Sequence, residues 1–270
     1  MKTLPTRVLS SIAAIILVVL LYFFFRIYAF QLIIFAAVTI GGYEIARILF
    51  IKKPVFYLTL AFYFTLVAIF GFSAYVPDFT ALIFAAASVF FCLVCLLFQD
   101  RFQGLDELSL FLSKSILGFF YVGLLPSFAF QTLSLPQGET WFLALLSIVF
   151  AGDIGAYFFG LLLGEKKLMP KISPKKTVEG SIGGALFSVI AGIIFCYWLQ
   201  EISAIQMVLL SLIMSLFAQF GDLFESLLKR VADVKDSGTL MPGHGGVLDR
   251  IDGVLFACPI LLLGAKIFLS

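Results

Sequence analysis

Charged and hydrogen-bonding residues gather near the C-terminus of an otherwise apolar chain. The run from Ser226 to Asp252 contains Lys, Arg and Asp side chains together with the only His of the protein, His244. Hydrocarbon-like sequence flanks this run on both sides. Charge grouped this closely beside apolar segments indicates phosphate and metal chemistry at a membrane surface.

An acidic helix face begins just before this run. Asp222, Glu225, Ser226 and Lys229 have the spacing i, i+3, i+4 and i+7, which places them on one face of a helix. An ionised carboxylate in a membrane costs several kcal/mol unless it is paired, hydrated or metal-bound. The face therefore predicts a polar cavity, and a salt-bridge ladder with Lys229 is the structural alternative.

A second acidic pair opens the last apolar segment. Asp249 and Asp252 are three residues apart and share a face if that segment is helical. Asp222 and Asp249 could then face each other across the last two helices. Carboxylate oxygens near nucleotide phosphates suit Mg²⁺, which completes its octahedron with phosphate oxygens and water. The alternative for Asp252 is an acid favoured by the helix dipole.

A glycine-rich loop connects the two acidic stretches. Gly245 and Gly246 permit close backbone approach, and successive amides there could form an anion-binding nest at a helix N-terminus. Lys235 and Asp236 precede them. The imidazole of His244 either binds a phosphate, acts as acid or base, or only orients the loop.

A lone acid lies earlier in the chain, within an apolar segment. Asp153 is followed by Tyr157 and by small residues that permit close helix packing. It is a candidate for a second cation. A hydrogen bond to a Tyr or Ser side chain is the structural alternative.

A lysine-rich stretch follows, with five Lys residues between positions 166 and 176. In part this is a topology signal that attracts anionic lipid. Ser173, Lys175, Lys176 and Thr177 also combine hydroxyls with cations at the start of a helix, a combination that suits phosphate oxygens. We therefore expect these four residues to bind substrate.

Apolar segments long enough to cross a membrane fill the rest of the chain. Hydrophobic residues make up 62% of the sequence and charged residues 13%, far from the composition of soluble domains. A lipid environment requires each spanning segment to be helical. We expect an all-α polytopic membrane protein with nine spans, at 8–25, 28–48, 55–74, 79–98, 108–130, 140–163, 180–200, 205–228 and 248–269.

The distribution of Lys and Arg predicts the orientation of these spans. The N-terminus and the even-numbered loops carry nearly all of them, whereas the odd-numbered loops carry only Arg26. The N-terminus is therefore expected in the cytoplasm and the C-terminus outside. Residues 1–137 are expected to form a scaffold of about five helices and residues 138–270 a catalytic part of about four.

The C-terminal half resembles the phosphatidate cytidylyltransferases (CDP-diacylglycerol synthases). Their signature is matched by the run Ser226-x-x-Lys-Arg-x₄-Lys-Asp-x₅-Pro-x-His-Gly-Gly-x-x-Asp-Arg-x-Asp252. The stretches Asp153-x-Gly-Ala-Tyr-x-x-Gly160 and Ser173-Pro-Lys-Lys-Thr-x-Glu-Gly180 also resemble family blocks. Residues 1–137 resemble the family only in hydropathy, length and number of spans.

The resemblance implies that CTP and phosphatidate react to CDP-diacylglycerol and pyrophosphate, with Mg²⁺ and a possible second cation. It also implies a homodimer in the bacterial inner membrane whose site faces the cytoplasm, with membrane lipid but no nucleic acid among its partners. The residues expected to act in catalysis are Asp222, Lys229, Arg230, Lys235, Asp236, His244, Asp249 and Arg250.

We expect substrate contacts from Ser173, Lys175, Lys176, Thr177, Ser226, Gly245 and Gly246. The expected metal ligands are Asp222 and Asp249, with Asp153, Glu225 and Asp252 as further candidates. Two alternatives remain open from the sequence. One is a CTP-dependent polyprenol or lipid kinase, which would release CDP, and the other is an ion-coupled secondary transporter.

Overall fold

Helices make up nearly all of the described chain. The computed structural model describes residues 16, 18–51, 55–199, 202–240 and 245–269. Short helical turns complete the longer helices: the 3₁₀ turns η1 (Pro77–Phe79) and η2 (Gln99–Arg101) and the π-helical turn η3 (Phe119–Leu124). The helices are α2 (Ile27–Leu49), α3 (Phe56–Tyr75), α4 (Thr80–Leu97), α5 (Leu105–Gly118), α6 (Leu125–Leu133), α7 (Gly138–Leu162), α8 (Val178–Phe195), α9 (Ala204–Val231) and α10 (Leu248–Phe268).

Eight helical segments of the described residues are long and apolar enough to cross a membrane. The helices α5, η3 and α6 together form one of them, Leu105–Leu133. These segments coincide with eight of the nine predicted spans and confirm an all-α polytopic architecture. The first predicted span, at 8–25, lies largely outside the described residues, so the count of nine stays a prediction.

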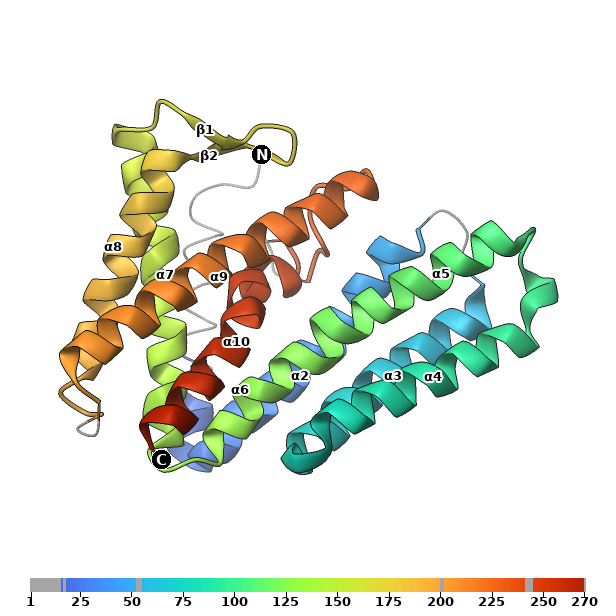
Figure 1. The fold of residues 1–270 in the computed structure, drawn as a ribbon, viewed down its shortest axis with the longest axis horizontal. Helices are drawn as coiled ribbons and strands as arrows, with labels where there is room; N and C mark the ends of the chain where they lie inside the picture. The colour runs from blue at the N-terminus through green and yellow to red at the C-terminus, as the bar shows by residue number, and fades with distance from the viewer. Residues whose placement is uncertain (1–15, 17, 52–54, 200–201, 241–244, 270) are drawn as a thin grey trace. The chain divides into compact units, whose positions relative to one another are not determined.

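A two-stranded hairpin, which was not expected from the sequence, interrupts the helical architecture. Strands β1 (Lys167–Met169) and β2 (Ser173–Thr177) pair antiparallel, with Lys167 opposite Thr177. The Val178 amide donates to the Lys166 carbonyl at 2.9 Å, which extends the pairing into the start of α8. The hairpin connects the C-terminal end of α7 to the N-terminal end of α8 (Figure 1).

The chain divides into two compact units, and the first comprises residues 1–130 and 232–250. In this unit α2 packs on α3 and α5, and α3 packs on α4. Aromatic side chains fill its core: the Phe62 ring stacks on Phe119, and Phe91 meets Phe119 edge-on, both at 5.0 Å between ring centroids. All three rings are buried.

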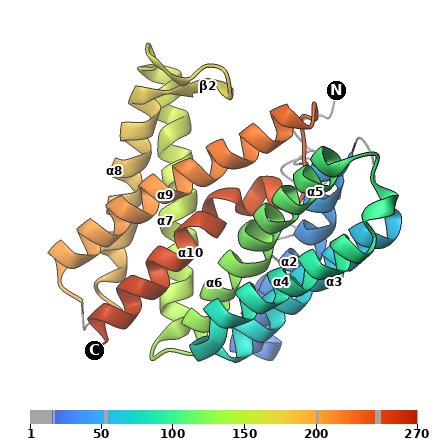
Figure 2. The same cartoon turned by 45° about the vertical axis from the view of Figure 1, so that its right-hand side comes forward.

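The second unit comprises residues 131–231 and 251–270. Here α7 packs on α8, and α9 packs on both, as Figure 2 also shows. Glycines allow the backbones to approach closely. A Cβ atom at Gly155 would lie 2.6 Å from the Gly183 carbonyl oxygen, and one at Gly221 would lie 2.4 Å from the Asp252 carbonyl oxygen.

The compact units differ from the sequence-based division at residue 137. The loop before α10, within residues 232–250, belongs to the unit that contains α2 to α5. The division into a scaffold, 1–137, and a catalytic part, 138–270, concerns function and stays a prediction. The loop nevertheless shows that residues of the first half contact a candidate functional segment.

Candidate functional site

The lysine-rich hairpin meets the acidic face of α9 within the second unit. The Lys176 Nζ lies 2.6 Å from Asp222 Oδ2, and both side chains are partly exposed. The Ser226 hydroxyl, one turn further along α9, donates to Asp222 Oδ1 at 3.4 Å. Asp222 therefore lies where the acidic face of α9 meets the lysine-rich hairpin.

A buried ion pair lies next to it on the same helix. The Lys229 Nζ donates to Glu225 Oε2 at 2.8 Å, and the Glu225 side chain is fully buried. A carboxylate at such a depth requires compensation, since isolated burial of charge is costly. The pair has i, i+4 spacing, and its geometry agrees with the salt-bridge alternative for these two residues.

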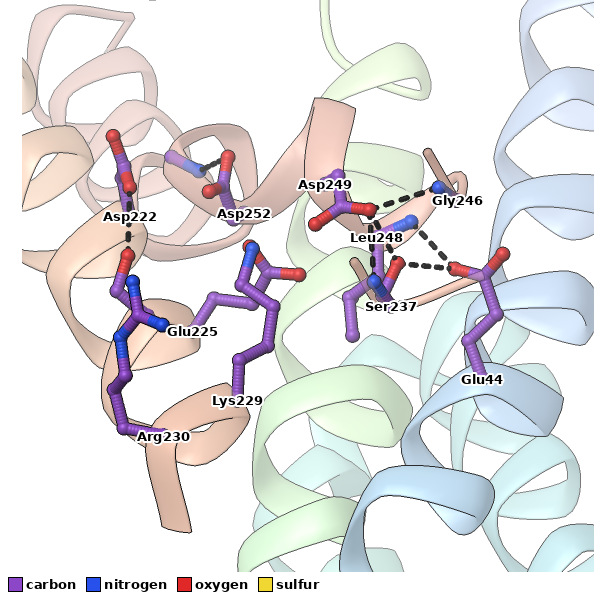
Figure 3. Close-up of polar contacts among 12 residues, drawn as sticks. Glu44, Asp222, Glu225, Lys229, Arg230, Ser237, Gly246, Leu248, Asp249 and Asp252 are labelled. Atoms are coloured by element: carbon purple, nitrogen blue, oxygen red, sulfur yellow. Dashed lines mark hydrogen bonds and ion pairs between the residues drawn. The ribbon is translucent and has the colours of Figure 1, made fainter. Parts of the chain in front are cut away.

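Asp252 adds a third carboxylate from α10. Its Oδ1 accepts a hydrogen bond from the Gly253 amide at 2.8 Å. The carboxyl group lies near enough to Asp222 and Glu225 for their charges to interact. Figure 3 shows Asp222 on α9 and Asp252 on α10 in the same part of the second unit. Three acids and two lysines therefore form one charged cluster.

Backbone contacts fix the hairpin that supplies Lys176. The Thr177 hydroxyl accepts from the Gly180 amide at 3.1 Å and caps the N-terminus of α8. Glu179 accepts from the amides of Glu165 and Lys166 at 3.1 and 3.2 Å. The phosphate contact predicted for Thr177 stays a prediction, and the structure gives its hydroxyl a capping role.

Arg230 joins the end of α9 to the turn of the hairpin. Its Nε donates to the Ile172 carbonyl oxygen at 3.3 Å, while the side chain remains exposed. Lys175 on β2 is also exposed, and Ser173 starts that strand. Lys176 of the hairpin contacts the acidic face, and Arg230 contacts the turn of the hairpin. The roles of these basic and hydroxyl residues toward substrate stay predictions.

A separate carboxylate network organises the loop before α10 in the first unit. Asp249 Oδ2 accepts from the Ser237 amide at 2.9 Å, the Ser237 hydroxyl at 3.0 Å and the Gly246 amide at 2.8 Å. Glu44 of α2 accepts from the Ser237 hydroxyl at 2.9 Å. It also accepts from the amides of Val247 and Leu248, at 3.0 and 2.9 Å. Figure 3 shows these bonds converging on the start of α10.

This network changes the interpretation of the glycine-rich loop. The amides of Gly246, Val247 and Leu248 donate to protein carboxylates, so in this structure they do not form the expected anion-binding nest. A Cβ at Gly246 would lie 2.5 Å from both Glu44 carboxylate oxygens. The glycine is therefore required for the approach of Glu44. The substrate contacts of Gly245 and Gly246 stay predictions.

Glu44 is the residue that the sequence analysis missed. Only 3% of it is exposed, and its partners Val247 and Leu248 are more than 200 positions away in the chain. The available signal was an ionisable residue inside an apolar helix, which indicates function by default. No local pattern identified its partner, because the bonds are to backbone amides of a distant loop.

The remaining predicted residues lie in different surroundings. Asp153 is exposed on α7, and Lys235, Asp236 and Arg250 are exposed near the loop of the first unit. His244 lies outside the described residues, so its role stays a prediction. The structure thus unites Asp222, Glu225, Ser226, Lys229 and Asp252 with Lys176, and separately unites Asp249 with Glu44 and Ser237.

The chemistry of the acidic cluster fits a hard divalent cation. Carboxylate oxygens are the ligands that Mg²⁺ prefers, and Mg²⁺ usually takes one or two of them together with water and substrate phosphates. Among the residues that the structure describes, no group of three or more His, Cys, Asp or Glu side chains forms a ready-made metal cage. Asp222 is partly exposed and interacts with Asp252, so it could supply one of the one or two carboxylates that Mg²⁺ takes together with water and phosphates.

The apolar helices and the charged cluster define a polytopic membrane protein with a charged candidate site. The model of the cytidylyltransferase family matches residues 5–268, and the chain belongs to this family.

Similar curated proteins carry one name. The chain is 43% identical over 150 residues to a phosphatidate cytidylyltransferase of Bacillus subtilis, covering 55% of this chain and 56% of the relative. It is 42% identical over 164 residues to a phosphatidate cytidylyltransferase of Staphylococcus aureus, covering 60% of each. The chain therefore spans less than two thirds of the length of these relatives.

Proposed function

We propose that this protein transfers a cytidylyl group from CTP to phosphatidate and releases pyrophosphate and CDP-diacylglycerol. The observation that carries the proposal is the ion pair between Lys176 and Asp222. It joins Lys176, in a stretch that resembles a family block, to Asp222, which lies four residues before the run that resembles the family signature. The names of the relatives from Bacillus subtilis and Staphylococcus aureus support the same reaction.

The reaction requires little covalent help from the protein. The phosphate of phosphatidate is already an anion near pH 7, because its second pKa is about 6. One of its oxygens attacks the α-phosphorus of CTP in line, and the bond from that phosphorus to the β-phosphate oxygen breaks. Pyrophosphate takes the electron pair. Catalysis then consists of positioning and charge stabilisation.

Each charged group of the cluster has a place in this scheme. Lys176, which is partly exposed, and Arg230, which is exposed, neutralise phosphate charge at the hairpin. Lys229 is held by Glu225, so its ammonium group has a fixed position. Lys235, Asp236 and Arg250 remain candidates in the first unit, and His244 orients its loop or assists proton transfer.

We keep Asp222 and Asp249 as the proposed ligands of Mg²⁺, with Glu225, Asp252 and Asp153 as candidates for a second cation. Such an ion, when bound, would neutralise the phosphates of CTP and polarise the reacting phosphorus. The neighbouring carboxylates of Glu225 and Asp252 support the role of Asp222, because a cation stabilises like charges that interact. The role of Asp249 rests on the family resemblance.

We further propose nine spans, a cytoplasmic N-terminus and an external C-terminus in a bacterial inner membrane. The excess of Lys and Arg in the even-numbered loops supports this orientation. CTP is soluble and phosphatidate is a lipid, so the site belongs at the cytoplasmic interface. We propose a homodimer, as the resemblance implies.

A product analysis tests the reaction. Purified protein is incubated with CTP, phosphatidate and Mg²⁺, and we expect equal amounts of pyrophosphate and CDP-diacylglycerol. Release of CDP with a phosphorylated lipid would instead identify a lipid kinase. Ion flux into liposomes without any turnover of CTP would favour the transporter alternative.

A further inference from the structure

The first unit contains a large cavity that the proposed chemistry does not use. It has a volume of about 1040 Å³, which is at the upper end of the range for ligand pockets. Two predicted membrane helices, α2 and α3, and residues 238–240 of the loop line it. Its walls are mainly apolar, with Ile40, Phe50, Phe56 and Leu60 among them.

Several of the large apolar side chains that line the cavity are exposed. Phe56 and Leu60 on α3 are 69% and 43% exposed, and Ile51 is 49% exposed. On helices that are long and apolar enough to cross a membrane, such surfaces meet lipid chains and not water. The cavity therefore opens where hydrocarbon is available to fill it.

One cation lines the cavity. Arg47, in the last turn of α2, is exposed and lies over the Tyr43 ring at 5.8 Å from its centroid. Within the described part of the chain, it has no carboxylate partner. Thr59 also lines the cavity, and its buried hydroxyl oxygen has no hydrogen-bond partner among the described residues.

The cavity shares residues with the loop before α10. Glu44 lines it and also accepts hydrogen bonds from Ser237 and the start of α10. Gly238 lines it directly after Ser237. A lipid in this cavity would therefore lie beside the loop that carries the signature residues.

We propose that this cavity binds an acyl chain of the phosphatidate substrate, with Arg47 attracting the anionic headgroup at its opening. Apolar walls select a hydrocarbon chain, and the unpaired cation selects an anionic lipid over a zwitterionic one. The lipid whose phosphate has to reach the signature loop is the substrate itself, so this inference rests on the proposed function.

The test compares Leu60→Trp, which fills the cavity, with Leu82→Trp, which places the same side chain on the exposed surface of α4. In mixed micelles, Leu60→Trp should raise the KM for dioleoyl phosphatidate about tenfold, the equivalent of about two lost methylene contacts. The KM for CTP and for short-chain dioctanoyl phosphatidate should change less than twofold. Leu82→Trp should change none of them.

Binding of labelled dioleoyl phosphatidate without CTP separates the two proposals. If Leu60→Trp and Arg47→Gln weaken this binding but the wild-type protein makes no CDP-diacylglycerol, the cavity assignment stands and the proposed reaction fails. If CDP-diacylglycerol forms and both variants bind phosphatidate like the wild type, the cavity assignment is overturned. Equal competition by phosphatidylglycerol would also overturn it, because the occupant would then be a general anionic phospholipid.

If Leu60→Trp does not fold, the phosphatidate affinity of Arg47→Gln alone tests the cavity proposal. This side chain is exposed, so its replacement leaves the core intact. We expect its affinity for dioleoyl and dioctanoyl phosphatidate to fall about tenfold alike, because the headgroup is common to both. Unchanged affinity for both lipids would refute the role of Arg47 and the proposal with it.

Discussion

At the scale of single residues, the carboxylates of Asp222 and Glu44 have different surroundings and therefore different expected roles. Asp222 is partly exposed and contacts a lysine from a separate element, which is the arrangement of a group that exchanges partners with a ligand. Glu44 is buried and accepts three hydrogen bonds from one loop, which is the arrangement of a structural anchor. Their substitutions should therefore have different effects.

Replacing Glu44 should mainly affect stability. Glu44→Ala leaves the amides of Val247 and Leu248 without their acceptor, and hydrogen bonds to a charged group contribute about 1.5–3 kcal/mol each. We expect the free energy of unfolding to fall by about 2–4 kcal/mol, measured by thermal unfolding in detergent.

Two variants control this experiment. Glu44→Gln keeps one acceptor but turns an NH₂ group toward donors, so its loss should be intermediate. Glu107→Ala removes a partly exposed acid that accepts from the Gln103 amide at 2.7 Å, and should cost less than about 1 kcal/mol. Equal losses for Glu44→Ala and Glu107→Ala would contradict the anchoring role.

Replacing Asp222 should affect turnover and leave the fold intact. Asp222→Asn removes the charge that faces Lys176 and that is proposed to bind Mg²⁺. We expect kcat to fall at least about 100-fold, since preorganised charge contributes several kcal/mol to a transition state. The thermal unfolding midpoint should stay near that of the wild type, and Asp78→Asn, an exposed acid outside the cluster, should keep full activity. A fully active Asp222→Asn variant would remove this residue from the site.

At the scale of elements, the crossing of α9 and α10 fixes the position of the acidic cluster. Gly221 directly precedes Asp222, and a Cβ there would lie 2.4 Å from the Asp252 carbonyl oxygen. Only glycine permits this approach, so the backbones of the two helices touch where the carboxylates emerge. A larger residue at position 221 must push the helices apart.

A pair of Gly→Ala substitutions tests this contact. Gly221→Ala should destabilise the protein by about 1–3 kcal/mol through overpacking, and should lower activity because Asp252 moves. Gly71→Ala on α3 has nothing within 4 Å of the added atom and should be neutral or stabilising by up to about 1 kcal/mol. Thermal unfolding of both variants is the measurement. A tolerated Gly221→Ala would contradict the close crossing.

The elements also show what the sequence can predict. The acidic face of α9 followed from helical spacing alone, because Asp222, Glu225 and Lys229 contact neighbours on their own helix. The hairpin of β1 and β2 did not, since its strands are short and rich in lysine, without the alternation typical of strands. The contacts of Glu44 with the start of α10 could not be predicted from the sequence either, because they join residues more than 200 positions apart.

At the scale of the whole molecule, hydropathy was enough to predict the architecture. Eight of the predicted spans have helices of matching position, since lipid leaves a spanning backbone few alternatives. The two compact units do not follow the sequence-based division at residue 137, because the loop within residues 232–250 packs with the first unit. Hydropathy reports spans but contains no information on which spans pack together.

The orientation of the spans is a prediction at this scale. Alkaline phosphatase is active only outside the cytoplasm, so a fusion after the C-terminal residue should be active in bacterial cells. A fusion after Asp233, in the loop predicted to be cytoplasmic, should be inactive. The reverse pattern would contradict the proposed orientation and the cytoplasmic site.

The most direct test of the central claim follows the position of a label. The purified protein receives phosphatidate, Mg²⁺ and CTP labelled at either the α- or the γ-phosphate. The proposed cytidylyl transfer predicts that only the α-label enters the lipid, that the γ-label leaves as pyrophosphate, and that both processes stop when Mg²⁺ is chelated. Entry of the γ-label into the lipid, or no label in the lipid at all, would contradict the account.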